Sequence, residues 1–452
     1  MSMFDSCKID DNVLNKLAYL AEKNGKIDPE YYTMYDVKRG LRNNNGTGVL
    51  VGLTQVGDVH GYIIDEGEKT PIDGRLTYRG IDIKDIVNGF ESENRFGFEE
   101  VCYLLLFGKL PTKTELKQFQ EILGKCRSLP EGFVEDMILK APSNDIMNKL
   151  ERSVLVCYSY DPNPDDISVK NVLRQSIELI SRFPAMIAYG YQAKAHYFDN
   201  KSLYIHSPQP NLSTAQNILH MIRPDNKYTK TEAETLDLAL VIHAEHGGGN
   251  NSAFATHVVS STGTDTYSAI AAAVGSLKGP KHGGANIKVM GMIDNIKKNV
   301  SNWEDDSAIR DYLLKILRKE AFDGSGLIYG IGHAVYTKSD PRAELLKSKA
   351  EQLASEKGRI KELNLYKKIE EISKKIFAES GKVISANVDF YSGFVYDMLN
   401  IPKELYTPIF ATARVPGWCA HRIEQLVSEP KIVRPAYKNV KEAVKYIRLD
   451  ER

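Results

Sequence analysis

Hydrophobic spacing of helical period is the feature that most limits what this chain of 452 residues can fold into. Thr112 and Glu115 form a capping-box pattern, in which each side chain can bond the backbone N–H of the other residue. Leu116, Phe119 and Leu123 follow it on one helical face. We therefore predict a helix that begins just after Thr112.

The same spacing recurs in later parts of the chain. A similar helix is predicted to start near Thr231 and Glu234. Residues 343–382 are amphipathic and helical in composition, with a break predicted near Gly358. Helical packing, rather than a central sheet, is therefore expected to build the core.

Only one early region favours β-structure. Residues 48–53, 59–64 and 76–78 are short runs rich in β-branched or aromatic residues, bounded by Gly, Asp and Pro. They predict a small sheet or two hairpins. The predicted fold class is accordingly all-α, with minor β-hairpins near the N-terminus.

Charge and composition exclude several classes of protein. Lys plus Arg number 59 and Asp plus Glu number 59, so the chain lacks the positive field that binding to nucleic acid or to an acidic membrane surface requires. Hydrophobic residues make up 42% and charged residues 26%, as in ordinary globular proteins. No apolar run approaches the length of a membrane-spanning helix. We expect neither nucleic acid nor a membrane as a partner.

Cysteine usage and the N-terminus predict a cytoplasmic protein. The five cysteines are dispersed and form no C-x-x-C pair, which argues against disulfides and against structural zinc. The first residues include early acids and no apolar stretch, unlike a secretory signal.

Three histidines lie beside glycines within a hundred residues. They are His246 in His-Ala-Glu-His-Gly-Gly-Gly-Asn, His282 in Gly-Pro-Lys-His-Gly-Gly, and His333 in Gly-Ile-Gly-His-Ala-Val. Glycine allows a backbone to approach a ligand closely. A single such histidine is usually structural, whereas three together favour a site.

A metal site and a nucleotide-binding loop are the two alternatives for these motifs. His243 and His246 are spaced i, i+3 and could chelate a metal, but the sequence is not H-E-x-x-H and no second ligand pair follows. The glycines of 275–281 and 326–332 miss the spacings of the Walker and dinucleotide loops. We therefore predict no metal and no nucleotide cofactor.

One acid and three arginines complete the pattern. Asp389 stands between apolar residues near a helix start, and Arg342, Arg414 and Arg434 each lie next to a proline or two residues from one. A guanidinium offers a rigid fork for carboxylates. Histidines, an acid and fixed arginines together indicate acid–base chemistry on a small polyanionic acid. The structural alternatives are a helix N-cap for Asp389 and solvated surface arginines.

These motifs, in this order, resemble the citrate synthase family from about Gly48 to Tyr437. Leu-Thr-Tyr-Arg-Gly-Ile-Asp-Ile at 76–83 and Asp-Pro-Arg at 340–342 also match that family. Gly-Trp-Cys-Ala-His at 417–421 looks more like its prokaryotic branch, which includes 2-methylcitrate synthases.

The resemblance implies a reaction and a set of roles. Acetyl-CoA would condense with oxaloacetate and water to give citrate and CoA, with no metal or redox cofactor. Asp389 would be the base, His282 would support the enol, and His333 would polarise the ketone. The keto acid would be bound by His246, Arg342, Arg414 and Arg434, and coenzyme A by Leu327, Ile328, Tyr329, Gly330, Ile331, Gly332 and Lys338.

The resemblance also implies a domain plan and an assembly. Residues 48–283 and 400–452 would form a large helical domain, 284–399 a smaller inserted one, and 1–47 an N-terminal extension. The active unit would be a homodimer in which Arg434 reaches the partner's site. The prolines around Arg434 favour an extended arm, against the alternative of a solvated tail.

Two rival functions remain open at this point. A 2-methylcitrate synthase would use propionyl-CoA, and one extra carbon in an apolar pocket is worth only about 1–3 kcal/mol. A catalytically silent helical scaffold would usually have lost a catalytic group, whereas His282, His333 and Asp389 are all present.

Overall fold

The computed structural model describes residues 10–65, 68–429 and 431–452. Cys7 and the N-terminal stretch that argued against a secretory signal lie outside the described residues. The chain divides into two compact units, Leu53–Val433 and a second one made of Met1–Gly52 with Arg434–Arg452.

The smaller unit joins the two ends of the chain. Its N-terminal part holds helices α1 (Asp11–Gly25) and α2 (Pro29–Met34) and the 3₁₀ turn η1 (Arg39–Leu41), and its C-terminal part ends in the turn η4 (Leu449–Glu451). The two parts meet where the Lys438 ammonium lies 5.5 Å from the centre of the Tyr35 ring.

The larger unit begins with an antiparallel sheet of order β1-β2-β3. Its strands are β1 (Gly57–Asp65), β2 (Glu68–Tyr78) and β3 (Ile81–Asp82). The strands predicted at 59–64 and 76–78 are thus confirmed. The strand predicted at 48–53 is wrong: Gly48 makes one isolated bridge to Arg42, and no described strand pairs with the rest, so no ladder stabilises it.

Helices make up most of the larger unit, and the all-α fold class is confirmed. They are, in chain order, α3 (Ile83–Ser92), α4 (Phe98–Phe107), α5 (Lys113–Lys125), the π-helix η2 (Phe133–Leu139), α6 (Ile146–Tyr160), α7 (Val169–Asp199), α8 (Thr214–Ile222), α9 (Lys230–His243), α10 (Asn251–Ser260), α11 (Thr266–Lys278), α12 (Ala285–Asn299), α13 (Asp306–Leu317), α14 (Pro341–Glu356), α15 (Ile360–Glu379), α16 (Val388–Met398), the 3₁₀ turn η3 (Lys403–Leu405) and α17 (Tyr406–Ser428).

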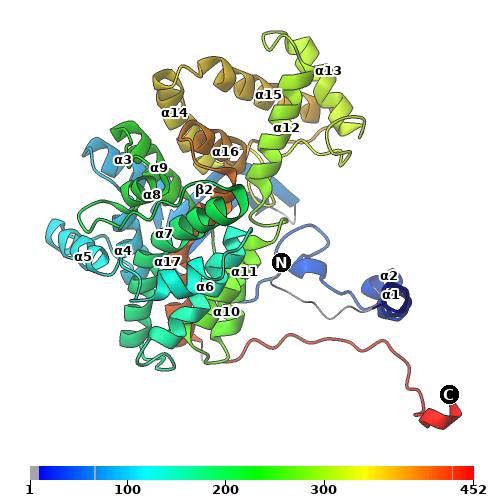
Figure 1. The fold of residues 1–452 in the computed structure, drawn as a ribbon. Helices are drawn as coiled ribbons and strands as arrows, with labels where there is room; N and C mark the ends of the chain where they lie inside the picture. The colour runs from blue at the N-terminus through cyan, green and yellow to red at the C-terminus, as the bar shows by residue number, and fades with distance from the viewer. Residues whose placement is uncertain (1–9, 66–67, 430) are drawn as a thin grey trace. The chain divides into compact units, whose positions relative to one another are not determined.

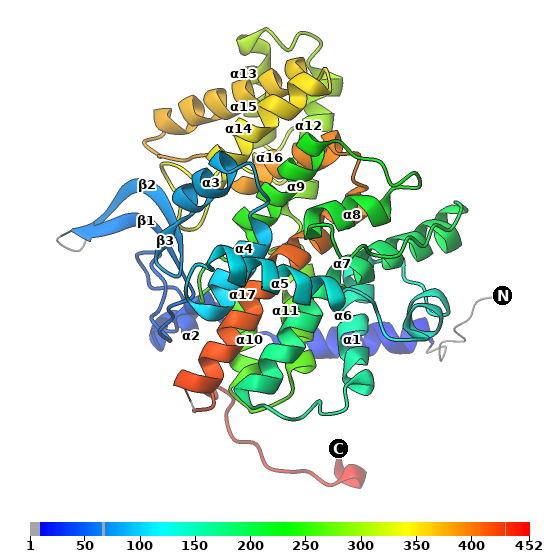
Figure 2. The same cartoon turned by 90° about the vertical axis from the view of Figure 1, so that its left-hand side faces the viewer.

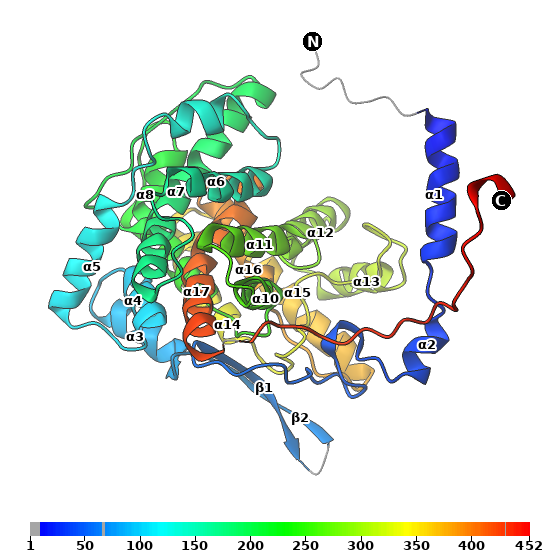
Figure 3. The ribbon, with the colours of Figure 1, turned by 90° about the horizontal axis from the view of Figure 1, so that it is seen from below.

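Helix α17 is the centre of the packing. It contacts α4 on one side and α10 and α11 on the other, as Figure 1 and Figure 3 show. Nearly all of its residues from Tyr406 to Arg422 are buried, including Trp418. A side chain on the part of α17 from Tyr406 to Arg422 is therefore held in the interior.

Helix ends agree with the sequence in two places and differ in one. The capping box of Thr112 and Glu115 opens α5, and Gly358, with a φ of 66°, separates α14 from α15. Helix α9 starts two residues earlier than predicted, with Thr229 and Glu232 as its capping box. The sequence carries two overlapping boxes, and ion pairs from Arg223 and Lys357 to the buried Glu232 select the earlier one.

Helices α12 to α16 pack largely on one another and gather at one end of the larger unit (Figure 1, Figure 2). They fall within the segment 284–399 that the sequence assigned to a smaller domain. The division into large and small domains itself stays a prediction. No described helix combines the length and apolarity that a membrane span needs.

The loop before α14 depends on a glycine. Gly330 has a φ of 79°, and an added Cβ would lie 2.8 Å from Val289 Cγ2 and 2.9 Å from Phe390 Cβ. A left-handed non-glycine residue costs about 1–2 kcal/mol, and overpacking adds about 1–3 kcal/mol.

We therefore predict that Gly330→Ala lowers the free energy of unfolding, measured in urea, by the sum of the backbone-strain and overpacking costs. The control is Gly89→Ala in α3, where an added Cβ meets nothing within 4 Å. That change is expected to stabilise the helix by about 0.5–1 kcal/mol. Equal effects of the two substitutions would show that the packing around Gly330 is not tight.

Candidate active site

His246 lies in the turn just beyond the end of α9. The helix stops at His243, and the glycines after His246 allow a turn in which Gly247 has a φ of 79°. The His246 ring is half-buried, with its Nε2 buried, and it packs edge-on against the rings of His333, 5.3 Å away, and Tyr336, 5.7 Å away. Burial, and then the charge of Arg342, hold the pKa of His246 well below its usual range, so the ring is neutral.

His333 has a defined tautomer. Its Nδ1 accepts hydrogen bonds from the backbone N–H groups of Val335 and Tyr336, each at 3.1 Å. In the neutral ring the proton must therefore sit on Nε2. The ring also stacks on Tyr336, with 4.9 Å between the ring centres. A neutral His333 thus carries its donor hydrogen on Nε2.

Backbone pairing joins the segment before Asp389 to the segment before His333. The Gly332 N–H donates to the Ser385 carbonyl at 2.7 Å, and the Asn387 side chain donates to the Gly332 carbonyl at 2.8 Å. The N-cap hypothesis for Asp389 is wrong, because Asn387 caps α16 and accepts from the Asp389 N–H. Burial raises the pKa of the Asp389 carboxyl to about 6, although Arg342 opposes this.

Arg342 is tied to the same helix through Asp340. The two side chains form a bidentate pair, with Nε to Oδ1 at 3.1 Å and Nη2 to Oδ2 at 2.8 Å. Asp340 also accepts from the backbone N–H groups of Arg342 and Val388. One buried carboxylate therefore fixes the start of α14, the start of α16 and the Arg342 guanidinium.

Arg414 projects from α17 and is 1% exposed. Its Nε donates to the His243 carbonyl at 2.6 Å. Nη1 and Nη2 are buried and form no hydrogen bond within the described part of the chain. Burial lowers the pKa of this guanidinium to about 10, so it keeps its charge at neutral pH.

His282 lies in the turn between α11 and α12. Its Nε2 is 3.1 Å from Ser252 Oγ, which also accepts from the Trp418 indole at 3.0 Å. Burial, and then the charge of Arg414, lower the pKa of His282 to about 4. The ring is neutral at physiological pH and presents Nδ1 on the side away from Ser252.

The charge of Arg414 acts on the other residues of the site, which shows that they lie near one another. The charge of Arg414 contributes to the lowered pKa values of His246 and His282 and opposes the raised pKa of Asp389. His246 Nε2, like the two Arg414 nitrogens, is buried without a hydrogen-bond partner among the described residues. Such donors are expected to bind an anion with several oxygens.

Five further residues belong to this environment and were not predicted as site residues. Tyr336 touches both histidine rings, Ser252 holds His282, and Asp340 holds Arg342. Glu245 Oε1 lies 2.9 Å from His421 Nε2, and both side chains are fully buried. Only Asp340 had a signal in the sequence, since an Asp before Pro at a helix start is typical of an N-cap.

Several other predicted residues are described by their own surroundings. Arg434 belongs to the smaller unit and is exposed in an extended segment. Leu327 is exposed and Ile328 is buried in the core. Lys338 lies 3.5 Å from Asp73 on the surface. Their predicted roles remain predictions.

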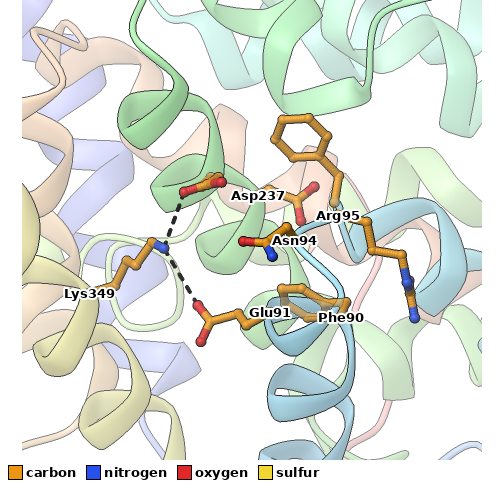
Figure 4. Close-up of a pocket in the computed structure, with 8 residues that line it drawn as sticks. Phe90, Glu91, Asn94, Arg95, Asp237 and Lys349 are labelled. Carbon is orange, nitrogen blue, oxygen red and sulfur yellow. Dashed lines mark hydrogen bonds and ion pairs between the residues drawn. The ribbon is translucent and has the colours of Figure 1, made fainter.

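A small pocket elsewhere contains none of the predicted residues. It lies where α3, α9 and α14 meet and has a volume of about 60 Å³. Figure 4 shows Lys349 reaching into it toward Glu91, and its ammonium lies 3.7 Å from Glu91 and 3.4 Å from Glu234. This pocket joins helices through ion pairs and is distinct from the site.

The comparisons with known proteins agree with one another. A family model described as citrate synthase, C-terminal domain, matches residues 45–436. A citrate synthase of Haloferax volcanii is 34% identical over 404 residues, which cover 88% of this chain and 94% of that protein. A 2-methylcitrate synthase of Shewanella oneidensis is 33% identical over 365 residues, covering 80% and 87%.

A solved structure gives the same answer at the level of the fold. It is the ternary complex of carboxymethyl coenzyme A and oxaloacetate with the citrate synthase of Thermoplasma acidophilum. It superposes with a TM-score of 0.75 and 27% sequence identity, covering 92% of this chain and 99% of that one.

Proposed function

Since the chain belongs to the citrate synthase family, we propose that it condenses acetyl-CoA with oxaloacetate and water to give citrate and free CoA, the first step of the tricarboxylic acid cycle. The observation that carries this proposal is the buried Arg414, whose two terminal nitrogens lack partners among the described residues beside neutral histidines. The enzyme is an acyltransferase that converts the acyl group to an alkyl group.

Binding of oxaloacetate is assigned to His246, Arg342 and Arg414. The dianion supplies the carboxylate oxygens that the buried donors of Arg414 and His246 require. Arg342 keeps its bidentate contact to Asp340 and so has a fixed orientation. Fixed guanidiniums orient the ketone before the reaction, which lowers the entropic cost of reaching the transition state.

The methyl group of acetyl-CoA gives its proton to Asp389. A carboxylate whose pKa is about 6 is a stronger base than one with an ordinary value. His282, neutral at physiological pH, donates a hydrogen bond from Nδ1 to the thioester oxygen where negative charge develops. Ser252 Oγ lies 3.1 Å from Nε2 and holds the ring in place. Preorganised donors of this kind are worth about 3–4 kcal/mol each.

Carbon–carbon bond formation then takes place at the ketone. The enol carbon attacks the ketone carbon of oxaloacetate, and the His333 Nε2–H stabilises the negative charge that moves to the ketone oxygen. Water afterwards hydrolyses the citryl thioester and releases CoA. No step in this scheme calls for a metal or a redox cofactor. Leu327, Ile328, Tyr329, Gly330, Ile331, Gly332 and Lys338 are proposed to contact coenzyme A.

A second candidate within the same chemistry is 2-methylcitrate synthase with propionyl-CoA. A relative of that name is 33% identical, close to the 34% of a relative named citrate synthase. The reacting groups are the same for both substrates. The difference would therefore lie in a few apolar residues around the acyl group, where one extra carbon is worth about 1–3 kcal/mol.

The first test is CoA thiol release with acetyl-CoA and with propionyl-CoA, each in the presence of oxaloacetate. We expect a higher kcat/KM for acetyl-CoA by at least about tenfold, within the range that one extra carbon permits. A preference of that size for propionyl-CoA would replace citrate by 2-methylcitrate as the product. Absence of thiol release with both substrates would contradict the proposal that the protein is an enzyme of this kind.

The second test concerns Asp389 as the base. Asp389→Asn should bind oxaloacetate nearly as well as the unchanged protein but lose exchange of the acetyl-CoA methyl protons, because an amide cannot accept them. The control is Asp397→Asn, the same change on the same helix, which should leave exchange intact. Retained exchange in Asp389→Asn would remove the residue from the base role.

The pH dependence follows from the same group. Below pH 6 Asp389 is protonated and cannot act as a base, so kcat/KM for acetyl-CoA should fall about tenfold for each pH unit below about 6. A carboxyl with an ordinary pKa would delay this fall to about pH 4. The midpoint of the pH profile, measured on the enzyme with Asp389 intact, distinguishes the raised pKa from an ordinary one.

The active unit is proposed to be a homodimer in the cytoplasm. Support for the location comes from Cys102, Cys126, Cys157 and Cys419, all of which are free thiols. Support for the dimer comes from Arg434, an exposed arginine in an extended segment next to Pro435. Such a segment suits an arm that carries Arg434 into the partner's site.

A mixed dimer tests this arrangement. In a dimer of one Arg434→Ala subunit and one Asp389→Ala subunit, a site that borrows its arginine contains either both defects or neither. Purified heterodimers should therefore recover about half of the normal activity. If Arg434 acts within its own chain, each site carries one defect, and the heterodimer should be as inactive as the parent homodimers.

A further inference from the structure

A cluster of potential metal ligands lies between α10 and α17, outside the residues assigned to the reaction. It consists of His257 on α10 with His421 and Glu424 on α17, and one ligand atom from each lies within 4.8 Å of the others. His421 Nδ1 is 3.1 Å from His257 Nε2 and 3.8 Å from Glu424 Oε2. The spacing of His421 and Glu424, i and i+3, places both on one face of α17.

Both histidine rings have their other nitrogen held by an oxygen acceptor. His421 Nε2 lies 2.9 Å from the Glu245 carboxylate, and His257 Nδ1 lies 2.9 Å from Gln425 Oε1. The Gln425 amide is oriented, because its Nε2 donates to the Glu429 carbonyl at 3.0 Å. Each ring therefore carries an N–H on that outer nitrogen.

The inner nitrogens consequently face each other with their lone pairs. Two acceptors 3.1 Å apart require a proton or a cation between them. A histidine that donates its outer N–H to a carboxylate or an amide is the usual arrangement around a protein-bound metal ion. The His257–His421 pair has this arrangement on both sides.

Glu424 supplies a third ligand atom of the correct kind. Its Oε1 accepts from the Gln55 N–H at 2.7 Å. Its Oε2 is buried, forms no hydrogen bond within the described part of the chain, and lies on the His421 side. An unpartnered carboxylate oxygen beside two imidazole nitrogens completes a two-histidine, one-carboxylate set.

We propose that His257, His421 and Glu424 form a binding site for a divalent transition-metal ion of the zinc type. Zn²⁺ takes nitrogen and carboxylate ligands at about 2.0–2.2 Å, which places the ligand atoms of a tetrahedral site about 3.3 Å apart. The observed separations of 3.1 and 3.8 Å lie on either side of this value. His257 is only partly buried, so the ion has a route from solvent, and water can be its fourth ligand.

The rival occupant is a proton shared by the two rings. Burial disfavours a charged His421, but Glu245 outweighs this and raises its pKa to about 9. In the absence of metal a proton therefore fills the gap at neutral pH, and the ion must displace it, as metal ions generally do at histidine ligands.

The test measures zinc binding directly, so its result is independent of the proposed reaction. The full-length chain, stripped of metal with a chelator, is titrated with Zn²⁺ in competition with a chromogenic chelator. His257→Gln and Glu424→Gln keep the size and a hydrogen-bonding group while removing a ligand. His196→Gln, an exposed histidine near the end of α7, is the matched control. Circular dichroism checks that each variant is folded.

We expect one tight site per chain that the control retains. Loss of a residue that only hydrogen-bonds to a metal ligand already weakens metal binding by about 10–100-fold, so loss of either ligand should weaken it at least that much. Equal affinities of His257→Gln and the unchanged chain would place the zinc elsewhere. No binding to the unchanged chain at micromolar zinc would mean that only a proton occupies the gap. Either result overturns the proposal.

Discussion

The burial of the Arg414 guanidinium is the constraint around which the site is built. A buried charge is costly unless other groups compensate for its lost hydration. Here one nitrogen bonds the His243 carbonyl, the Phe410 ring lies 4.8 Å from the guanidinium carbon, and the negative charge of Glu245 acts on it from nearby. The two remaining nitrogens are held in place by α17 and are available to an anionic substrate. The helix packing thus holds these two nitrogens in position for the substrate before it binds.

Asp340 does for the second arginine what α17 does for the first. It pairs with Arg342, caps α14 and accepts from the first N–H of α16. Because α16 carries Asp389, the substrate-binding guanidinium and the proposed base cannot move independently. The same loop system fixes His333 through the Gly332–Ser385 pairing. His333, Arg342 and Asp389 therefore form one rigid group, which faces His246, His282 and Arg414 from the rest of the larger unit.

One physical cause gives the histidines and the carboxylate their different states. Burial disfavours the charged form of every group. It lowers the pKa of His282 to about 4 and raises that of Asp389 to about 6. The histidines thereby remain neutral hydrogen-bond donors, and the arginines alone supply positive charge for binding anions. Asp389 becomes a stronger base. Direct contacts adjust this effect, as Glu245 shows by raising the pKa of the fully buried His421 to about 9.

The sequence by itself determined the helical class, the α5 cap, the break at Gly358 and the family, which the comparisons confirm. These depend on local spacing and on motifs within a few residues. Tertiary structure decided the rest. The run at 48–53 lacks a partner strand, α9 begins at the capping box that its ion pairs select, and Asn387 rather than Asp389 caps α16. The roles of Ser252, Tyr336 and the Glu245–His421 pair were also hidden, because hydrogen bonds and desolvation depend on which segments meet, and those segments lie up to about 180 residues apart in the chain.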